Sequence, residues 1–157
     1  MSWYNWWGSS SATDIQTQLQ QKVQFLSSGF FQPTSGSTSN TINSNSGVIL
    51  NPEQLILGQF LNRTGDVPGP IYDITSSASD LVSFLIKLVD PFPISEGFAW
   101  NVAYYNNTGQ SISLVGGNGV TIGTPITLLP SHISTLRFYL ADATIGGENI
   151  YISLLGN

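Results

Sequence analysis

The chain has 157 residues, a net charge of −5 and only 8% charged residues, whereas 41% of its residues are hydrophobic. Its four Lys and Arg residues are too few for the basic surface that nucleic-acid binding requires, so we expect no direct contact with nucleic acid. The absence of cysteine excludes disulfides and thiolate metal sites. A surface so poor in charge repels its neighbours weakly, which favours a protein that works packed against other proteins.

Residues 1–47 are predicted to form an N-terminal arm. Met1 to Gly8 contains three of the four Trp residues, and apolar residues at helical spacing from Asp14 to Leu26 predict an amphipathic helix. Pro33 to Gly47 has the Ser, Thr and Asn content of a flexible linker. Exposed Trp is a liability on a solitary monomer, so we expect the arm to anchor in a neighbouring protein or a membrane surface. The predicted anchor residues are Trp3, Tyr4, Trp6, Trp7, Ile15, Leu19, Val23 and Leu26. Sugar stacking by the Trp cluster, or disorder, are the alternatives.

The body of the protein is predicted to span residues 48–157, and its first half mixes strands with one helix. Ser77 and Asp80 have the spacing of a helix N-cap, and the apolar residues from Leu81 to Leu88 follow at helical spacing. The prolines after Asp90 should end this helix. Predicted strands precede it at Val48–Leu50, Leu55–Leu61 and Ile71–Ile74, with a loop over residues 65–70.

The last third of the chain carries the clearest pattern. Between Gly97 and Leu155, apolar and polar residues alternate, and Gly, Asn, Pro or Ser interrupt the alternation every few residues. A period of two places each apolar set on one face of a strand, so we expect six further strands here. The predicted fold is all-β: a single antiparallel jelly-roll sandwich of eight or nine strands with one inserted short helix.

Residues with catalytic potential are scattered. His132 is the sole histidine, and the sequence places it in a turn, away from any partner for acid–base chemistry. A glycosidase pair such as Asp73 with Glu96 is conceivable, but no pattern selects it. Gly116–Gly123 lacks the Lys of a phosphate-binding loop and is predicted to be a tight hairpin. We therefore expect no enzyme, no cofactor and no metal site.

Two segments match the N-glycosylation sequon. They are Asn62-Arg63-Thr64 and Asn106-Asn107-Thr108. Because Asn is common in turns, we interpret both as turn sequences.

Several motifs of the body resemble those of a known group. They are Gln54 to Gly58 with Leu61 to Gly65, Asp73 to Val82, Gly97 to Gly109 with its Asn-Thr-Gly ending, Gly117 to Thr121, and Asn149 to Leu155. Together they resemble the small single-jelly-roll penton and minor capsid proteins of large double-stranded DNA viruses of algae and amoebae. The resemblance covers about residues 54–155 and is one of pattern, and the arm does not match it.

The resemblance implies a structural protein of the virion, assembled inside the host cell. It implies the penton that closes the fivefold vertex of an icosahedral shell, with a homopentamer and neighbouring capsid proteins as its partners. Because the arm is aromatic and nearly neutral, the internal viral membrane is a further possible partner. Alternatives are a trimeric fibre, spike or minor capsid domain, and a carbohydrate-binding module.

Overall fold

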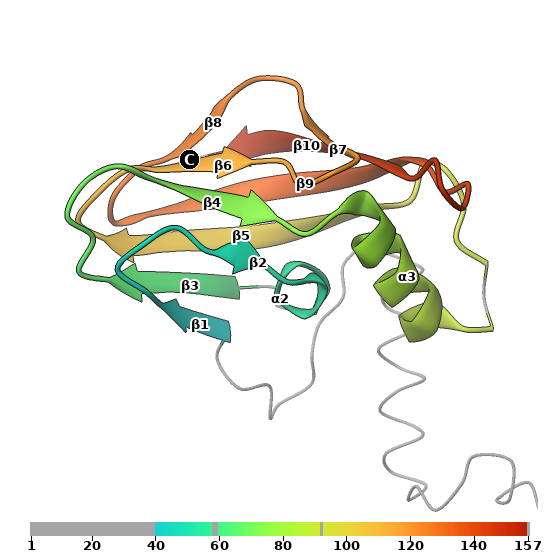
Figure 1. The fold of residues 1–157 in the computed structure, drawn as a ribbon, viewed down its shortest axis with the longest axis horizontal. Coiled ribbons are helices and arrows are strands. Elements are labelled where there is room, and N and C mark those ends of the chain that lie inside the picture. The colour runs from blue at the N-terminus through green and yellow to red at the C-terminus, as the bar shows by residue number, and fades with distance from the viewer. Residues whose placement is uncertain (1–39, 58–59, 92, 157) are drawn as a thin grey trace, which may run out of the picture.

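The computed structural model describes residues 40–57, 60–91 and 93–156, which form two β-sheets and two helices (Figure 1). Six-stranded sheet A has the order β1-β3-β5-β9-β10-β7, and four-stranded sheet B has the order β2-β4-β6-β8. The strands of sheet A are β1 (Asn40–Asn43), β3 (Phe60–Gly65), β5 (Ala99–Thr108), β7 (Val120–Ile122), β9 (His132–Asp142) and β10 (Asn149–Gly156). Those of sheet B are β2 (Ile49–Leu50), β4 (Ile71–Thr75), β6 (Ile112–Val115) and β8 (Ile126–Leu128).

From β1 to β9 the chain alternates between the two sheets with every strand. The pairs β1–β2, β3–β4 and β5–β6 therefore form three successive arches, each with one strand in either sheet. The arches stack in parallel. In sheet A, Ile42 lies beside Arg63 and Arg63 beside Asn106, and in sheet B, Ile49 lies beside Ile74 and Ile74 beside Val115.

The prediction of an all-β protein with two layers of strands is confirmed, but the prediction of antiparallel pairing is wrong for much of the fold. Strands pair in parallel in β1–β3, β3–β5, β2–β4, β4–β6 and β7–β10, and antiparallel in β5–β9, β9–β10 and β6–β8. This mixed pairing does not confirm a jelly-roll topology. Alternation of side chains reports which face of a strand is buried, and it does not encode the direction of the neighbouring strand.

Two helices connect arches at one end of the sandwich. Helix α2 (Pro52–Ile56) joins β2 to β3 and begins with a capping box between Asn51 and Gln54. Helix α3 (Ala78–Val89) joins β4 to β5, and the Ser77 hydroxyl accepts a hydrogen bond from the Asp80 N–H at 3.1 Å. The predicted N-cap and helix in this region are thus confirmed. Neither helix is long and apolar enough to cross a membrane.

Two local predictions are wrong between residues 40 and 56. Leu55 and Ile56 belong to α2, although they were expected in a strand; the capping box and Pro52 start a helix that a short apolar run does not reveal. Residues 40–43, expected in the flexible linker, form β1 and pair with β3. The sequence does not reveal this edge strand because it consists of Asn and Thr apart from Ile42, the one apolar side chain that it packs against the core.

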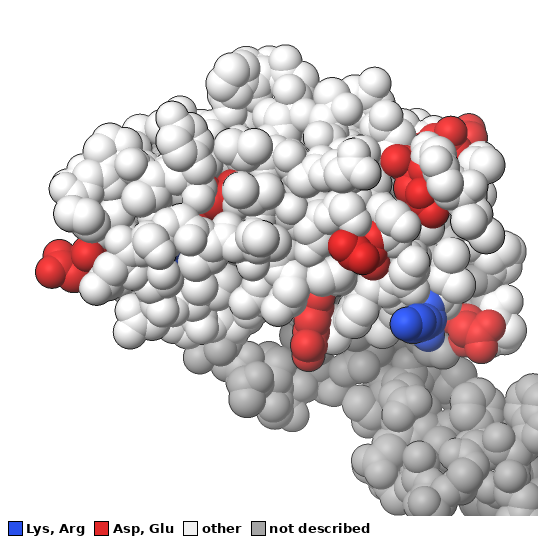
Figure 2. Space-filling view, in the orientation of Figure 1, with Lys and Arg blue, Asp and Glu red and all other residues white. Residues whose placement is uncertain are grey.

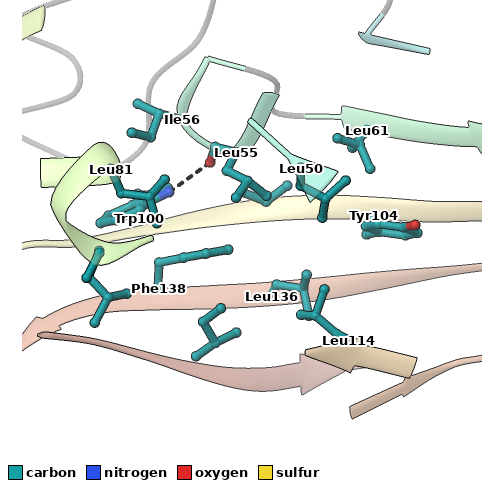
Figure 3. Packing of buried hydrophobic residues seen from close by; sticks show 14 of the residues in the cluster. Leu50, Leu55, Ile56, Leu61, Leu81, Trp100, Tyr104, Leu114, Leu136 and Phe138 are labelled. Carbon is teal, nitrogen blue, oxygen red and sulfur yellow. Dashed lines mark hydrogen bonds between the residues drawn. The ribbon is translucent and has the colours of Figure 1, made fainter. Parts of the chain in front are cut away.

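The core lies between the sheets and under both helices (Figure 3). Phe98, Trp100 and Val102 are the first apolar positions of the alternation that begins at Gly97; Trp100 and Val102 are buried, and Phe98 packs against the cluster. The Trp100 ring stacks on Phe138 with centroids 5.1 Å apart, and its Nε1–H donates to the Leu55 carbonyl at 2.9 Å. The alternation of the last third therefore locates the core correctly. The other buried apolar residues of β6 to β10 follow the same alternation: Ile112, Leu114, Ile126, Leu128, Leu136, Leu140, Ile150 and Ile152.

Candidate functional site

The predicted anchor residues cannot be placed. Trp3, Tyr4, Trp6, Trp7, Ile15, Leu19, Val23 and Leu26 all lie outside the described residues. A candidate site must therefore be sought on the sandwich itself, in its buried polar groups, its hollows and its outer faces.

The strongest cluster of titratable groups is buried inside the arches. The Arg63 Nε–H donates to Asp73 Oδ2 at 3.0 Å, and both side chains are fully buried. The Tyr104 hydroxyl donates to the same Asp73 oxygen at 2.5 Å. Burial, together with the Asp73 charge beside it, raises the pKa of Tyr104 far above its usual value.

This cluster joins all three arches. The Arg63 guanidinium, from the second arch, also donates to the Ser44 and Ser46 carbonyls in the turn of the first arch. Asp73 Oδ1 accepts from the Val48 N–H, also in the first arch, at 3.1 Å. Tyr104 belongs to the third arch. Because every polar atom is engaged within the protein and none reaches solvent, the cluster is suited to holding the arches together and not to catalysis.

The pair of acids considered as a glycosidase site is separated by this arrangement. Asp73 is fully buried against Arg63, so it cannot contact a substrate. Glu96 instead lines an open hollow at the surface, together with Ser95, Ala143 and Thr144. Hydrogen bonds from Thr144, one of these lining residues, hold the pKa of Asp142 below its usual value. Among the described residues, no group of three His, Cys, Asp or Glu side chains could hold a metal ion.

His132 opens β9 and is exposed, with Nδ1 2.7 Å from the Pro130 carbonyl oxygen. The sequence places His132 in a turn, and the structure places it at the first residue of β9, directly after that turn. Ser131 next to it has a left-handed backbone, with φ of 57°, and its N–H donates to the Asn106 carbonyl. The contacts of His132 and Ser131 are those of a turn.

The glycine-rich segment 116–123 forms a turn, but the prediction of a hairpin is wrong. The strands on either side, β6 and β7, belong to different sheets. Gly119 has φ of +73°, as a tight turn requires, and the Asn118 carbonyl accepts from the Ala78 N–H at the start of α3. A side chain at Gly117 would overlap the Thr75 carbonyl, with Cβ 2.4 Å from its oxygen. The glycines therefore allow this turn to pass close to the start of α3.

The two sequons lie in strands β3 and β5, so the interpretation of both as turn sequences is wrong. Asn62 is half-buried in β3. Asn106 in β5 is fully buried, and its amide donates to the Gln110 and Leu128 carbonyls at 2.9 Å each. Its Oδ1 accepts from Thr108. The Asn106 side chain thus holds the following turn from within the strand, and it is not accessible to a glycan.

The outer faces of the sandwich are unusually poor in charge. Among the described strands, the charged side chains are buried Arg63 and Asp73, Asp142 at the end of β9, and exposed Arg137. Figure 2 shows few charged residues over the strands on one side of the molecule, with acidic residues toward its ends and around α3. Neither sheet therefore presents the charged surface that usually keeps proteins apart.

Exposed apolar and aromatic side chains occupy both faces instead. On sheet B, Ile49, Ile74 and Val115 lie side by side across three strands, and we call these three residues the apolar row. On sheet A, Tyr139 and Tyr151 are cross-strand neighbours, and both are more than 40% exposed. Sequence reasoning missed these faces because it followed the inward residues; the outward positions of the same alternation carried the signal.

Comparison of the chain with protein-family models, with curated proteins and with solved structures finds no match.

Proposed function

We propose that this protein is a structural subunit of a viral capsid, and that it forms the penton at the fivefold vertex of an icosahedral shell. The observation that carries the proposal is the pair of outer sheet faces, which bear exposed apolar and aromatic side chains and, away from the strand ends, one charged residue, Arg137. Contact of such faces with other proteins costs little desolvation free energy, because few charges have to be removed from water.

The proposal needs a sandwich with broad faces, and the two sheets provide it. The motif resemblance described above adds the viral assignment, and the jelly-roll form of the sandwich stays a prediction that this strand order does not carry. Five copies would close a ring by repeating one head-to-tail contact. The partners would be other copies of this chain, neighbouring capsid proteins and, through the arm, the internal membrane of the virion.

The parallel arches favour a second candidate, a trimeric fibre or spike domain. Strands β1, β3 and β5 stack in register in one sheet while β2, β4 and β6 stack in the other. Stacking of successive chain turns is the principle of elongated solenoid proteins, and three arches are a short example of it. This candidate would assemble with threefold symmetry.

The exposed pair Tyr139 and Tyr151 is the observation in favour of a carbohydrate-binding module. Aromatic rings on a flat sheet can stack on sugars. Trp100, the aromatic residue that would serve best, is buried in the core, which weakens this candidate.

The mass of the assembled full-length protein separates these candidates. Native mass spectrometry over a concentration series should give a pentamer if the penton proposal is right, and electron microscopy of the same sample should show five-membered rings. A trimer would overturn the penton in favour of the fibre, spike or minor capsid domain. A monomer at every concentration, together with a sugar bound on a glycan array, would overturn the structural role itself.

A further inference from the structure

The apolar row on sheet B is the most exposed set of aliphatic side chains in register on either face. Ile49 is 72% exposed, Ile74 38% and Val115 39%. Tyr72, two residues before Ile74 on the same face of β4, is 65% exposed. The other outward residues of β6 and β8 here are Ser113 and Thr127. Covering this face removes apolar surface from water and desolvates no charge.

The outer face of sheet A also bears exposed apolar side chains, Phe60 and Ile133, but it differs from sheet B in carrying a charge. Beside the Tyr139 and Tyr151 pair, the next row across the sheet contains Asn101, Arg137 and Ser153. Burying that row would desolvate an arginine for which no salt bridge is found among the described residues. An uncharged, apolar occupant therefore prefers sheet B.

The chain itself supplies such an occupant. In residues 1–39, Asp14 and Lys22 are the only charged residues and cancel each other. The apolar spacing of Ile15, Leu19 and Val23 predicts a helix with one apolar face, a form that commonly docks in an apolar surface.

The arm joins the sandwich at Asn40, beside α2. The Asn40 side chain, at the start of β1, donates to the Gln54 carbonyl in α2 at 3.1 Å. Helix α2 directly follows β2, which contains Ile49. The 13 residues between Leu26 and Asn40 have a root-mean-square reach of about 20 Å, and roughly 45 Å when extended. The arm can therefore reach a row on an adjoining molecule.

We propose that the apolar helix face of residues 14–26 from one copy docks on the apolar row of a neighbouring copy. This inference rests on the proposed assembly function and names the contact that holds the assembly together. Each copy has one arm and one row, so every copy both gives and receives this contact, which repeats around the ring of the proposed penton. The experiment must distinguish this contact from two alternatives: docking of the arm on its own sheet, and docking of the arm on a membrane.

The absence of cysteine from the chain allows a direct test. Full-length Leu19→Cys protein is mixed with full-length Ile49→Cys protein under mild oxidation. Because the two variants have the same intact mass, mass spectrometry of a non-reduced proteolytic digest identifies the mixed disulfide dimer by its linked peptides. The matched control replaces Ile49→Cys with Ile133→Cys, since Ile133 is 51% exposed on the outer face of sheet A. We expect the mixed dimer with Ile49→Cys and little of it with Ile133→Cys.

Three results would overturn the proposal. The first is equal cross-linking to both faces, and the second is none to Ile49→Cys. The third comes from the double variant Leu19→Cys, Ile49→Cys: a disulfide formed only within one chain would show that the arm covers its own sheet. Binding of the full-length protein to neutral phospholipid vesicles, with no mixed dimer in their absence, would assign the arm to a membrane instead.

A second pair of variants measures the contribution of the row to assembly. Ile49→Asp should raise the dissociation constant of the oligomer by about tenfold or more, because docking would bury an unpaired carboxylate. Ile133→Asp should leave it nearly unchanged. If native mass spectrometry gives a ring that survives Ile49→Asp intact, the arm contact is wrong while the capsid role stands. If the mixed dimer forms but no closed ring exists, the arm contact stands and the penton role fails.

Discussion

Arg63 and Asp73 form an ion pair in the middle arch of the stack, with both side chains fully buried and 3.0 Å between Arg63 Nε and Asp73 Oδ2. Through the Ser46 carbonyl and the Tyr104 hydroxyl, the same pair contacts the arch on either side. A buried ion pair is not in itself a large gain in stability, but removing one partner leaves a charge that water cannot reach.

Replacement of Arg63 by Met should therefore lower the free energy of unfolding by about 3–5 kcal/mol, because Asp73 loses its counter-charge in the core. Urea unfolding of the full-length protein measures this change. Arg137→Met removes an exposed arginine and is the matched control, with an expected change within about 0.5 kcal/mol. Equal effects of the two variants would contradict the clamp that we assign to Arg63.

Tyr104 gives the fold a dependence on alkaline pH. Burial and the neighbouring Asp73 raise its pKa in the folded protein, so the folded state keeps the phenol proton when the unfolded chain begins to lose it near pH 10. The stabilisation due to Tyr104 is then complete below pH 10 and decreases above it, by up to about 1.4 kcal/mol per pH unit. The difference in unfolding free energy between the wild type and Tyr104→Phe should therefore narrow from pH 8 to pH 11. Urea titrations at each pH measure it, and a constant difference would refute the assignment.

The sequence predicts best where burial alone decides the structure. Trp100 and Val102 could be assigned to the core because a strand with one wet face must alternate. The same rule could not predict Arg63 as a core residue. It occupies an inward position where an apolar residue is expected, and its burial becomes possible only when Asp73 and the carbonyls of the first arch surround it.

The order in which the chain passes between the two sheets could not be predicted from alternation either. Alternation in β1, β3 and β5 is the same whether these strands pair in parallel or antiparallel, so the arches are set by the connections between strands. Asn51 and Gln54 show how local that information is. Their capping box starts the five-residue helix α2, in the connection that carries the chain from sheet B back to sheet A. The candidate interaction face depends on this winding, because only parallel stacking brings Ile49, Ile74 and Val115 into one row.

Trp100 links the first helix to the sandwich core. Trp100→Phe would leave the Leu55 carbonyl without its donor and would open space beside Phe138. We expect a loss of about 1–3 kcal/mol in unfolding free energy, from the unsatisfied carbonyl and the lost packing. Guanidinium unfolding of the variant measures this loss. Phe60→Leu, at a ring that is 46% exposed, is the control and should cost clearly less.

Close stacking of the first two arches requires a glycine at position 65. Gly65 has φ of +143°, and a Cβ there would lie 2.0 Å from the Ser44 carbonyl oxygen, in the turn that Arg63 also contacts. Gly65→Ala should therefore cost about 1–3 kcal/mol or more, since both the backbone and the neighbouring arch must shift. Gly69 lies in the same connection between β3 and β4, and a Cβ there would meet no atom within 4 Å. Gly69→Ala should be neutral or stabilise the fold by up to about 1 kcal/mol, because it restricts the unfolded chain. Thermal and urea unfolding of the two variants compare them directly, and a Gly65→Ala protein as stable as Gly69→Ala would show that the first arch does not pack against the second as described.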